Sequence, residues 1–371
     1  MSVPSSVTPG LHTLPVARHS AESFWRGRRV LLTGHTGFKG AWLHLWLREL
    51  GADVTGFALR PSTDPCLWAS IGTEAQSIIG DVRDEALVRS VIARVDPEIV
   101  IHMAAQALVR EAYHDPVGTY GTNVMGTVLL LAALRAAPRL RATVVVTSDK
   151  VYDNQGAGLA FSEGDRLGGH DPYSNSKACA ELVTASFRDS FFRAGPALAT
   201  ARAGNVIGGG DWSADRLIPD CIRALATGRA VRLRYPDAIR PWQHVLEPLS
   251  GYLVLAQALV EAPERAPTAV NFGPDPASFS TVREVVAGFC GRFGGAPGWE
   301  PDPGEHVPEA ATLTLSSDLA ARSLGWTWTL ELEQSLAWTA DWYRAHRDGE
   351  NMLEFTRRQL HSFRDAQRSR P

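Results

Sequence analysis

Tyr173 and Lys177 have the spacing that places two side chains on one face of a helix. An ammonium in that position lowers the pKa of the phenol. The phenol can then take the proton of an alcohol hydroxyl while hydride leaves the carbon that bears this hydroxyl. Such a pair also occurs by chance on helix surfaces. It gains weight here because an apolar strand, 143–147, ends shortly before it and is followed by the hydroxyl of Ser148. Together these residues predict a site that oxidises an alcohol.

Asp149 and Lys150 follow this hydroxyl directly. As an acid, Asp149 would have to keep its proton, which requires a pKa raised by desolvation. As a base, Lys150 would have to be neutral when it removes a proton. The alternative interpretation is an ion pair on the surface of a turn.

Gly34, Gly37 and Gly40 form a GxxGxxG loop between a predicted strand, 28–33, and a predicted helix, 41–50. A dinucleotide site needs a tight turn, a bare backbone near the pyrophosphate and helix N–H groups that face the phosphates. A glycine-rich structural turn is the alternative. Because the loop follows the first strand of an α/β chain, its position favours a cofactor site.

The third predicted strand ends at Asp81 and Val82, which are candidates for the adenine edge. An N-cap role is the alternative for Asp81. A ribose-binding acid is expected about 20 residues after the glycines, but Leu59 and Arg60 stand there. Since Arg60 would suit a 2′-phosphate, NAD is predicted and NADP stays open.

Strand patterns at 53–59, 78–81 and 99–102 alternate with helical patterns. This alternation predicts an α/β fold with a doubly wound parallel sheet of the Rossmann type. After Asn205 the chain is rich in Gly and Pro, and helical patterns return later, which predicts a smaller C-terminal substrate-binding lobe. The expected division is a flexible leader at 1–21, the NAD-binding domain at 22–205, the lobe mainly at 206–350 with some chain crossing back, and a C-terminal tail at 351–371. The end of the tail, 357–371, is expected to be a frayed, solvated helix.

Composition excludes several classes of partner. The 371 residues carry a formal net charge of −3 with 44% hydrophobic residues, so no nucleic-acid partner is predicted. The sequence shows no apolar run of about 20 residues, and no membrane partner is predicted. Four cysteines stand far apart in the sequence, which favours a cytoplasmic protein with reduced thiols. Because the sequence shows no His, Cys and Asp cluster with ligand spacing, no metal is predicted.

At this point the chain resembles the extended short-chain dehydrogenase/reductases, and more narrowly the CDP-glucose 4,6-dehydratases. The resemblance runs from about Phe24 to Tyr343. The motifs that carry it are TGHTGFKG at 33–40, HMAAQ at 102–106, TNVMGT at 122–127, TSDK at 147–150, DPY at 171–173, GNVIGGGDW at 204–212 and IRPWQHV at 239–245.

The resemblance implies an internal redox cycle. NAD takes hydride from C4 of the glucosyl ring of a CDP-hexose, water leaves across C5 and C6, and the hydride returns to C6. The implied catalytic residues are Ser148, Asp149, Lys150, Tyr173 and Lys177. The implied cofactor residues are Gly34, Thr36, Gly37, Phe38, Gly40, Asp81, Val82, Ala104, Ala105, Gln106, Asn123, Tyr173 and Lys177. The implied substrate residues are Asn205, Arg216, Arg240 and His244. A homodimer is expected by analogy, through helices near 117–134 and 174–193.

Two features depart from the family pattern. The segment 155–163 lacks the Trp- and Tyr-containing loop of relatives, and Val151 replaces a small polar or thiol residue. These differences concern the sugar lid and hence the hexose. A nucleotide-sugar 4-epimerase or decarboxylase is the alternative nearest in chemistry. A non-catalytic NAD-binding protein is the second alternative, and the intact Ser148, Tyr173 and Lys177 disfavour it.

Overall fold

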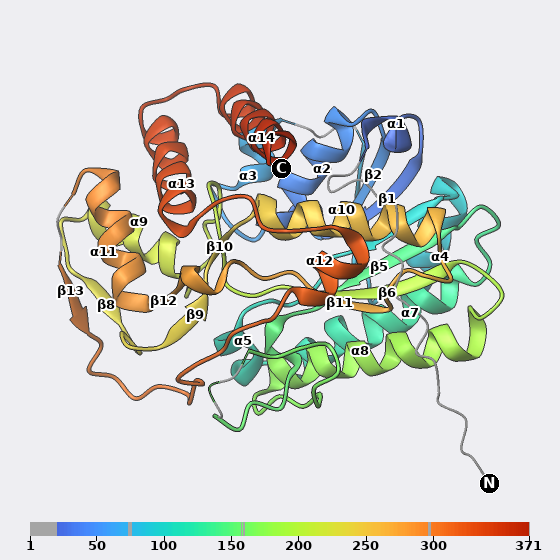
Figure 1. The fold of residues 1–371 in the computed structure, drawn as a ribbon, viewed down its shortest axis with the longest axis horizontal. Helices are drawn as coiled ribbons and strands as arrows, with labels where there is room; N and C mark the ends of the chain where they lie inside the picture. The colour runs from blue at the N-terminus through green and yellow to red at the C-terminus, as the bar shows by residue number, and fades with distance from the viewer. Residues whose placement is uncertain (1–20, 73–75, 157, 159, 296–297, 371) are drawn as a thin grey trace, which may run out of the picture.

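A seven-stranded parallel sheet forms the centre of the protein (Figure 1). The computed structural model describes residues 21–72, 76–156, 158, 160–295 and 298–370, so the expected leader lies outside the described residues apart from Ala21. The strand order is β11-β6-β5-β4-β1-β2-β3. The strands are β1 (Arg29–Thr33), β2 (Asp53–Ala58), β3 (Ser77–Ile79), β4 (Ile99–His102), β5 (Ala142–Val146), β6 (Ala197–Arg202) and β11 (Ala269–Asn271).

Helices cover both faces of this sheet, which explains why its strands are apolar on both sides. In β1, Val30 and Leu32 point into one core, and Leu31 points into the other. One face carries α2 (Phe38–Glu49), α10 (Leu246–Glu261) and α12 (Asp318–Leu324). The opposite face carries α4 (Glu85–Val95), α7 (Gly126–Leu134) and α8 (Pro172–Phe191). The doubly wound sheet predicted from the sequence is confirmed.

A smaller lobe lies beside the sheet, on the left of Figure 1. Its helices α9, α11 and α13 pack on one another, and short strand pairs complete it. Helix α10 and strand β11, which also follow residue 205, belong to the sheet layers. The bounds are β7 (Val206–Ile207), α9 (Leu217–Ala226), β8 (Val231–Leu233), β9 (Ile239–Pro241), β10 (Gln243–His244), η4 (Pro276–Ser278), β12 (Phe279–Thr281), α11 (Val282–Phe293), β13 (Trp299–Pro301) and α13 (Leu332–Arg347).

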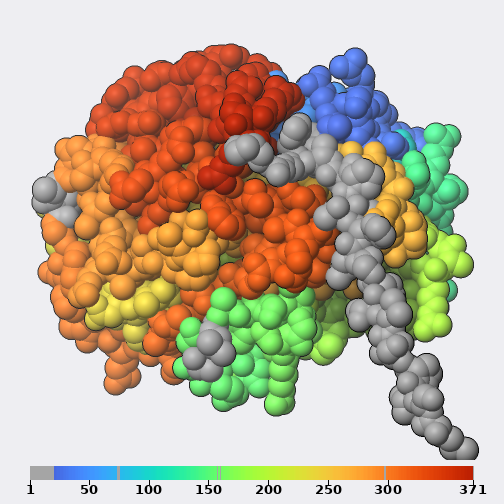
Figure 2. All heavy atoms as spheres, in the orientation of Figure 1, coloured from blue at the N-terminus to red at the C-terminus, as the bar shows by residue number. Residues whose placement is uncertain are grey.

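The C-terminal tail is not a frayed, solvated helix. It forms α14 (Met352–Ser369), which packs on α13 and on α3 (Leu67–Ile71). Leu360 and Phe363 are fully buried, and the Phe363 ring meets Trp46 edge to face at 5.7 Å. The many arginines conceal an apolar stripe at helical spacing, which the sequence analysis missed. Figure 2 shows this C-terminal part, in red, spread over the upper surface of the molecule.

The helical stretch Pro116–Leu134 corrects a second expectation. It joins α6 (Pro116–Tyr120), a π-helical turn η2 (Gly121–Met125) and α7 into 19 residues of mean hydropathy 1.4, enough by length and composition to cross a membrane. In the fold, this stretch packs against α4 and α8. Helices were expected near 117–134, so the length of the stretch was predicted and its mean hydropathy was not. The remaining elements are α1 (Glu22–Trp25), α5 (Val109–His114) and η3 (Asp149–Val151).

Candidate functional site

A cavity of about 780 Å³ opens at the carboxyl ends of β1, β4 and β5, between the sheet and the small lobe. The chain runs from β1 outward to β3 and then returns to place β4 on the other side of β1. Open α/β sheets bind their ligands at such a reversal of strand order. The topology therefore explains why the cavity lies here.

The glycine loop forms one wall of this cavity. Gly34 has φ +77°, and a Cβ on it would stand 2.7 Å from the backbone nitrogen of Ala104. A Cβ on Gly40 would stand 2.0 Å from the carbonyl oxygen of Gly34. Because only bare backbone fits, α2 begins directly against the loop and its N-terminus faces the cavity. This cradle fits the pyrophosphate of a dinucleotide such as NAD.

The other predicted cofactor residues line the same cavity, with one exception. Asn123 is buried behind the wall, where its Oδ1 accepts the backbone N–H of Gln106 at 2.9 Å. Its Nδ2 donates to the carbonyl oxygen of Gln106 and to Ser176 Oγ. Asn123 therefore holds Gln106 in place and does not face the cavity.

Asp81 lines the cavity and pairs with Arg83, with 2.6 Å between Arg83 Nη2 and Asp81 Oδ2. The hydrogen bond from Arg83 lowers the pKa of Asp81. The N-cap of α4 is Asp84, whose carboxylate accepts the N–H of Leu87. The alternative interpretation of Asp81 as an N-cap is therefore wrong.

All five predicted catalytic residues line the cavity, at the end of β5 and on the first turns of α8. Ser148 Oγ donates to Asp149 Oδ1 at 3.0 Å and accepts the N–H of Lys150 at 3.2 Å. Asp171 caps α8 by accepting the N–H of Ser174. The cap fixes the start of the helix and thereby the place of Tyr173.

The expectation that Lys177 lowers the pKa of Tyr173 is not met. Burial raises the pKa of Tyr173, and the charge of Arg216 and the nearby hydroxyl of Ser148 oppose the rise. Lys177 Nζ donates to the carbonyl oxygen of Val146 at 3.1 Å. Burial lowers the pKa of Lys177 to about 8.

Asp149 has the raised pKa that an acid requires. Burial raises it, against the charge of Lys150 and the hydrogen bond from Ser148. Its Oδ2 is buried without a partner, and a Cβ on Gly204 would stand 2.2 Å from it. The side chain of Asp149 therefore fits only because residue 204 is glycine. Gly204 belongs to the GNVIGGGDW motif, but this role was not predicted from the sequence.

Three of the four predicted substrate residues line the cavity, namely Asn205, Arg216 and Arg240. His244 is fully buried behind it, between the rings of Trp42 and Trp338, and its Nδ1 accepts the N–H of Leu246. His244 therefore supports the fold of the wall and does not face a ligand.

The guanidinium of Arg240 is already engaged. It donates to the carbonyl oxygen of Ile239 at 2.8 Å and lies 3.4 Å from the carboxylate of Glu309, which also lines the cavity. Arg216 Nη2 donates to the carbonyl oxygen of Ala107 at 2.8 Å. A planar guanidinium suits a diphosphate, but a phosphate at Arg240 must share it with Glu309. The sequence analysis missed Glu309, which lies 69 positions from its partner.

Lys39 is a further cavity residue that the sequence analysis did not select. Its Nζ donates to the hydroxyl of Tyr252 at 2.8 Å. Burial and the charges of Lys177 and Arg216 lower the pKa of Lys39 to about 7. Lys39 could have been selected from the sequence, because it belongs to the HTGFKG motif and lies in the first turn of the helix that follows the glycine loop.

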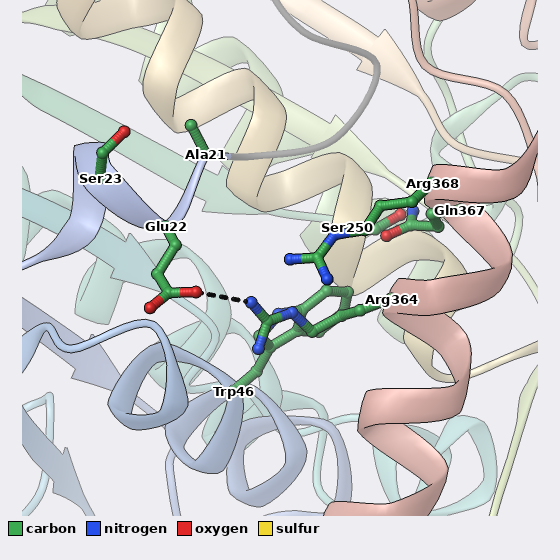
Figure 3. A pocket seen from close by; sticks show the side chains of 8 residues that line it. All are labelled: Ala21, Glu22, Ser23, Trp46, Ser250, Arg364, Gln367 and Arg368. Atoms are coloured by element: carbon green, nitrogen blue, oxygen red, sulfur yellow. Dashed lines mark hydrogen bonds and ion pairs between the residues drawn. The ribbon is translucent and has the colours of Figure 1, made fainter.

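The described residues of the 155–163 loop do not line the cavity. Phe161 stacks on Tyr152 at 4.7 Å, and Glu163 accepts the N–H of Asn271. A second cavity, of about 280 Å³, lies where α14 meets α1 and α2, and there Arg364 pairs with Glu22 (Figure 3). Among the described residues, no group of three or more His, Cys, Asp or Glu side chains is arranged to hold a metal.

The sequence model of the NAD dependent epimerase/dehydratase family matches residues 30–273. A CDP-glucose 4,6-dehydratase from Salmonella typhimurium is 46% identical over 353 residues, which cover 93% of this chain and 98% of the relative. A dTDP-glucose 4,6-dehydratase from Mycolicibacterium smegmatis is 29% identical, covering 86% and 94%.

Solved structures share the fold. MoeE5, in complex with UDP-glucuronic acid and NAD, is 26% identical with a TM-score of 0.73, covering 85% of this chain and 99% of that one. The epimerase Mth375 from Methanothermobacter thermautotrophicus has a TM-score of 0.78 at 22% identity, covering 88% and 96%. The second likeness concerns the fold alone.

Proposed function

Because the chain belongs to the NAD dependent epimerase/dehydratase family, we propose that it is a nucleotide-sugar 4,6-dehydratase that converts CDP-glucose to CDP-4-keto-6-deoxyglucose. The observation that carries the proposal is the buried Asp149, which accepts a hydrogen bond from Ser148 and lines the same cavity as Tyr173. An oxidation alone needs only Tyr173 and its neighbours. An elimination needs an acid as well, and Asp149 has the raised pKa for that role.

Bound NAD would supply a hydride acceptor that returns the hydride within the same cycle. Gly34, Gly37 and Gly40 would hold its pyrophosphate against the N-terminus of α2. Tyr173 would take the proton of the C4 hydroxyl. The resulting ketone acidifies the C5 proton, which Lys150 would remove while the proton of Asp149 leaves with the C6 hydroxyl as water.

The CDP-sugar preference and the homodimer belong to the same proposal. CDP-glucose is chosen because the 46% identical relative bears that name and covers nearly all of the chain. Arg240 and Asn205, which line the cavity, would contact the diphosphate. The dimer would form through the stretch Pro116–Leu134 and α8, which expose Val117 and Leu182.

The product identifies the reaction. The purified protein is incubated with NAD and CDP-glucose and no reductant, with UDP-, GDP- and dTDP-glucose in parallel. We expect a 4-keto-6-deoxy sugar nucleotide, formed fastest from CDP-glucose, without net consumption of cofactor. A C4 epimer would establish an epimerase, and carbon dioxide from a nucleotide glycuronate would establish a decarboxylase. NAD binding with no conversion would establish the non-catalytic alternative.

A further inference from the structure

A buried ion pair lies behind the end of β5, and the proposed reaction does not use it. Arg202, the last residue of β6, donates from Nε to Glu181 Oε1 at 3.0 Å and from Nη2 to Glu181 Oε2 at 2.8 Å. Both side chains are 4% exposed. Two buried charges lose their hydration, and apolar side chains of similar size are often at least as stable in such a place. The pair therefore calls for a role other than stability.

The ion pair holds both ends of the segment 147–152, which carries the three catalytic residues that follow β5. At the start of the segment, the hydroxyl of Thr147 donates to Glu181 Oε1. At its end, the hydroxyl of Tyr152 accepts a hydrogen bond from Arg202 Nη1 at 2.9 Å. Hydrogen bonds to charged groups are stronger than those between neutral groups. The two charges therefore restrain the segment from both sides.

The carboxylate of Glu181 also restrains α8. Tyr173, Lys177 and Glu181 are spaced by four residues, so they share one face of this helix, and all three are buried. Glu181 Oε2 accepts the hydroxyl of Thr200, in β6, at 2.6 Å. Helix α8 packs along β6 (Figure 1), and it cannot slide along the sheet without breaking these bonds. Glu181 therefore helps to set where Tyr173 and Lys177 lie.

We propose that Glu181 and Arg202 are positioning residues that hold the two halves of the site in register. One half lies on α8 and oxidises C4, and the other half follows β5 and eliminates water across C5 and C6. Both halves act on one bound hexose, so a displacement of about 1 Å between them can cost about 100-fold in rate. The inference rests on the proposed dehydratase function, since only a reaction with both steps needs both halves.

Other hydrogen bonds hold the main chain of this region without the ion pair. The N–H of Thr147 donates to the carbonyl oxygen of Ala201 at 2.9 Å. Lys177 Nζ, on α8, donates to the carbonyl oxygen of Val146, in β5, at 3.1 Å. The fold should therefore survive loss of the ion pair, while the side-chain ties between α8 and the two ends of the segment are lost.

The test removes both charges together. Glu181→Leu combined with Arg202→Met fills the space with apolar side chains, whereas removal of one partner would leave the other charge buried and unpaired. The matched variants are Thr147→Val and Tyr152→Phe, each of which deletes one hydroxyl and leaves the ion pair in place. Thr147→Ser keeps the hydroxyl and is the conservative control.

The amount of NAD bound per chain, measured by fluorescence titration, counts the folded sites, and rates are expressed per site. In the double variant we expect kcat with CDP-glucose to fall about 10- to 100-fold, while KM and the affinity for NAD change less than about threefold. Thr147→Val and Tyr152→Phe should each lower kcat about 3- to 10-fold. Thr147→Ser should match the wild type.

A positioning role makes a second demand, which a purely structural role does not make. Thr147→Val cuts the tie between the segment and Glu181, so it should not lower kcat further once the ion pair is gone. Effects that were independent would multiply instead. The triple variant, which adds Thr147→Val to the double variant, therefore measures whether Thr147 acts through the ion pair.

A double variant whose kcat per site stays within about twofold of the wild type would overturn the positioning role and leave the dehydratase function intact. The same holds if Thr147→Val keeps its full effect without the ion pair. If the double variant binds no NAD, Thr147→Val combined with Tyr152→Phe decides in its place, and an unchanged kcat there overturns the role. A wild-type protein that converts no sugar nucleotide would instead overturn the proposed function, and the inference with it.

Discussion

At the scale of single residues, neighbouring groups differ in what burial does to them. Burial raises the pKa of Asp149 and of Tyr173, and it lowers the pKa of Lys39 and of Lys177. In each case burial favours the neutral form over the charged form. With pKa values of about 7 and about 8, Lys39 and Lys177 can exchange protons near neutral pH, and the raised pKa of Asp149 favours its neutral form.

Tyr173→Phe should reduce the turnover rate about 100- to 10,000-fold, because the phenol oxygen takes part in proton transfer. The affinities for NAD and for CDP-glucose should change by no more than a few fold, since the ring remains in place. Steady-state rates and fluorescence titration of NAD check both expectations. A Phe variant that keeps most of its rate would contradict the role of Tyr173 as the C4 base.

Asp149→Asn and Lys150→Met should separate oxidation from elimination. Both variants retain Tyr173, so NADH absorbance at 340 nm should appear on mixing with CDP-glucose and then persist. In the wild type this signal should be transient, because the hydride returns to C6. If neither variant gives an NADH signal while both still bind substrate, Asp149 and Lys150 have no separate acid and base roles.

At the scale of elements, local patterns predicted where strands and helices lie. Strand Ile99–His102 has the predicted bounds, and Gly34 lies in the predicted turn between β1 and α2 with φ +77°. These features depend on local periodicity and on backbone conformations that favour glycine. The packing of α14 was missed, because it depends on what covers a helix.

The candidate site was predictable to the extent that strand ends indicate it. Residues directly after β1, β4 and β5 line the cavity as expected. Asn123 and His244 do not line the cavity, because a sequence motif does not show in which direction a side chain points. Glu309 and Gly204 were missed because their roles depend on contacts with Arg240 and Asp149 that only the folded chain creates.

Glu247, in the first turn of α10, makes a prediction about stability. It is fully buried and accepts the N–H groups of Thr329 and Leu330, and burial raises its pKa to about 8. A carboxyl whose pKa is higher in the folded protein than in the unfolded chain binds its proton more tightly when folded. Stability therefore falls as pH rises from the unfolded pKa through the folded pKa.

Glu247→Gln replaces the titratable carboxyl with an amide that does not titrate, while keeping the shape of the side chain. Between pH 5 and pH 7, the wild type should lose about 2 kcal/mol of unfolding free energy relative to the Gln variant. Urea denaturation of both proteins at the two pH values measures the difference. An identical pH dependence in the two proteins would show that Glu247 does not titrate in this range.

At the scale of the whole molecule, apolar side chains remain exposed on two neighbouring helical segments. Val117 is 81% exposed and Leu182 is 59% exposed. Burying such side chains against a second copy would stabilise a dimer. Sedimentation should give twice the chain mass of 40.3 kDa, and Val117→Asp combined with Leu182→Asp should give the chain mass. Leu59→Asp, which changes another exposed apolar residue, should leave the mass doubled. A wild-type protein that sediments as a single chain would contradict the dimer.

The central claim is that the hydride leaves C4 and returns to C6 of the same sugar within one closed cavity. The most direct measurement uses CDP-glucose that carries deuterium at C4 and carbon-13 elsewhere in the ring, mixed with unlabelled CDP-glucose. We predict that the product carries deuterium at C6 only in molecules that also carry carbon-13, with NAD unchanged in amount. Deuterium at C6 of molecules without carbon-13, or deuterium lost to water, would contradict the account.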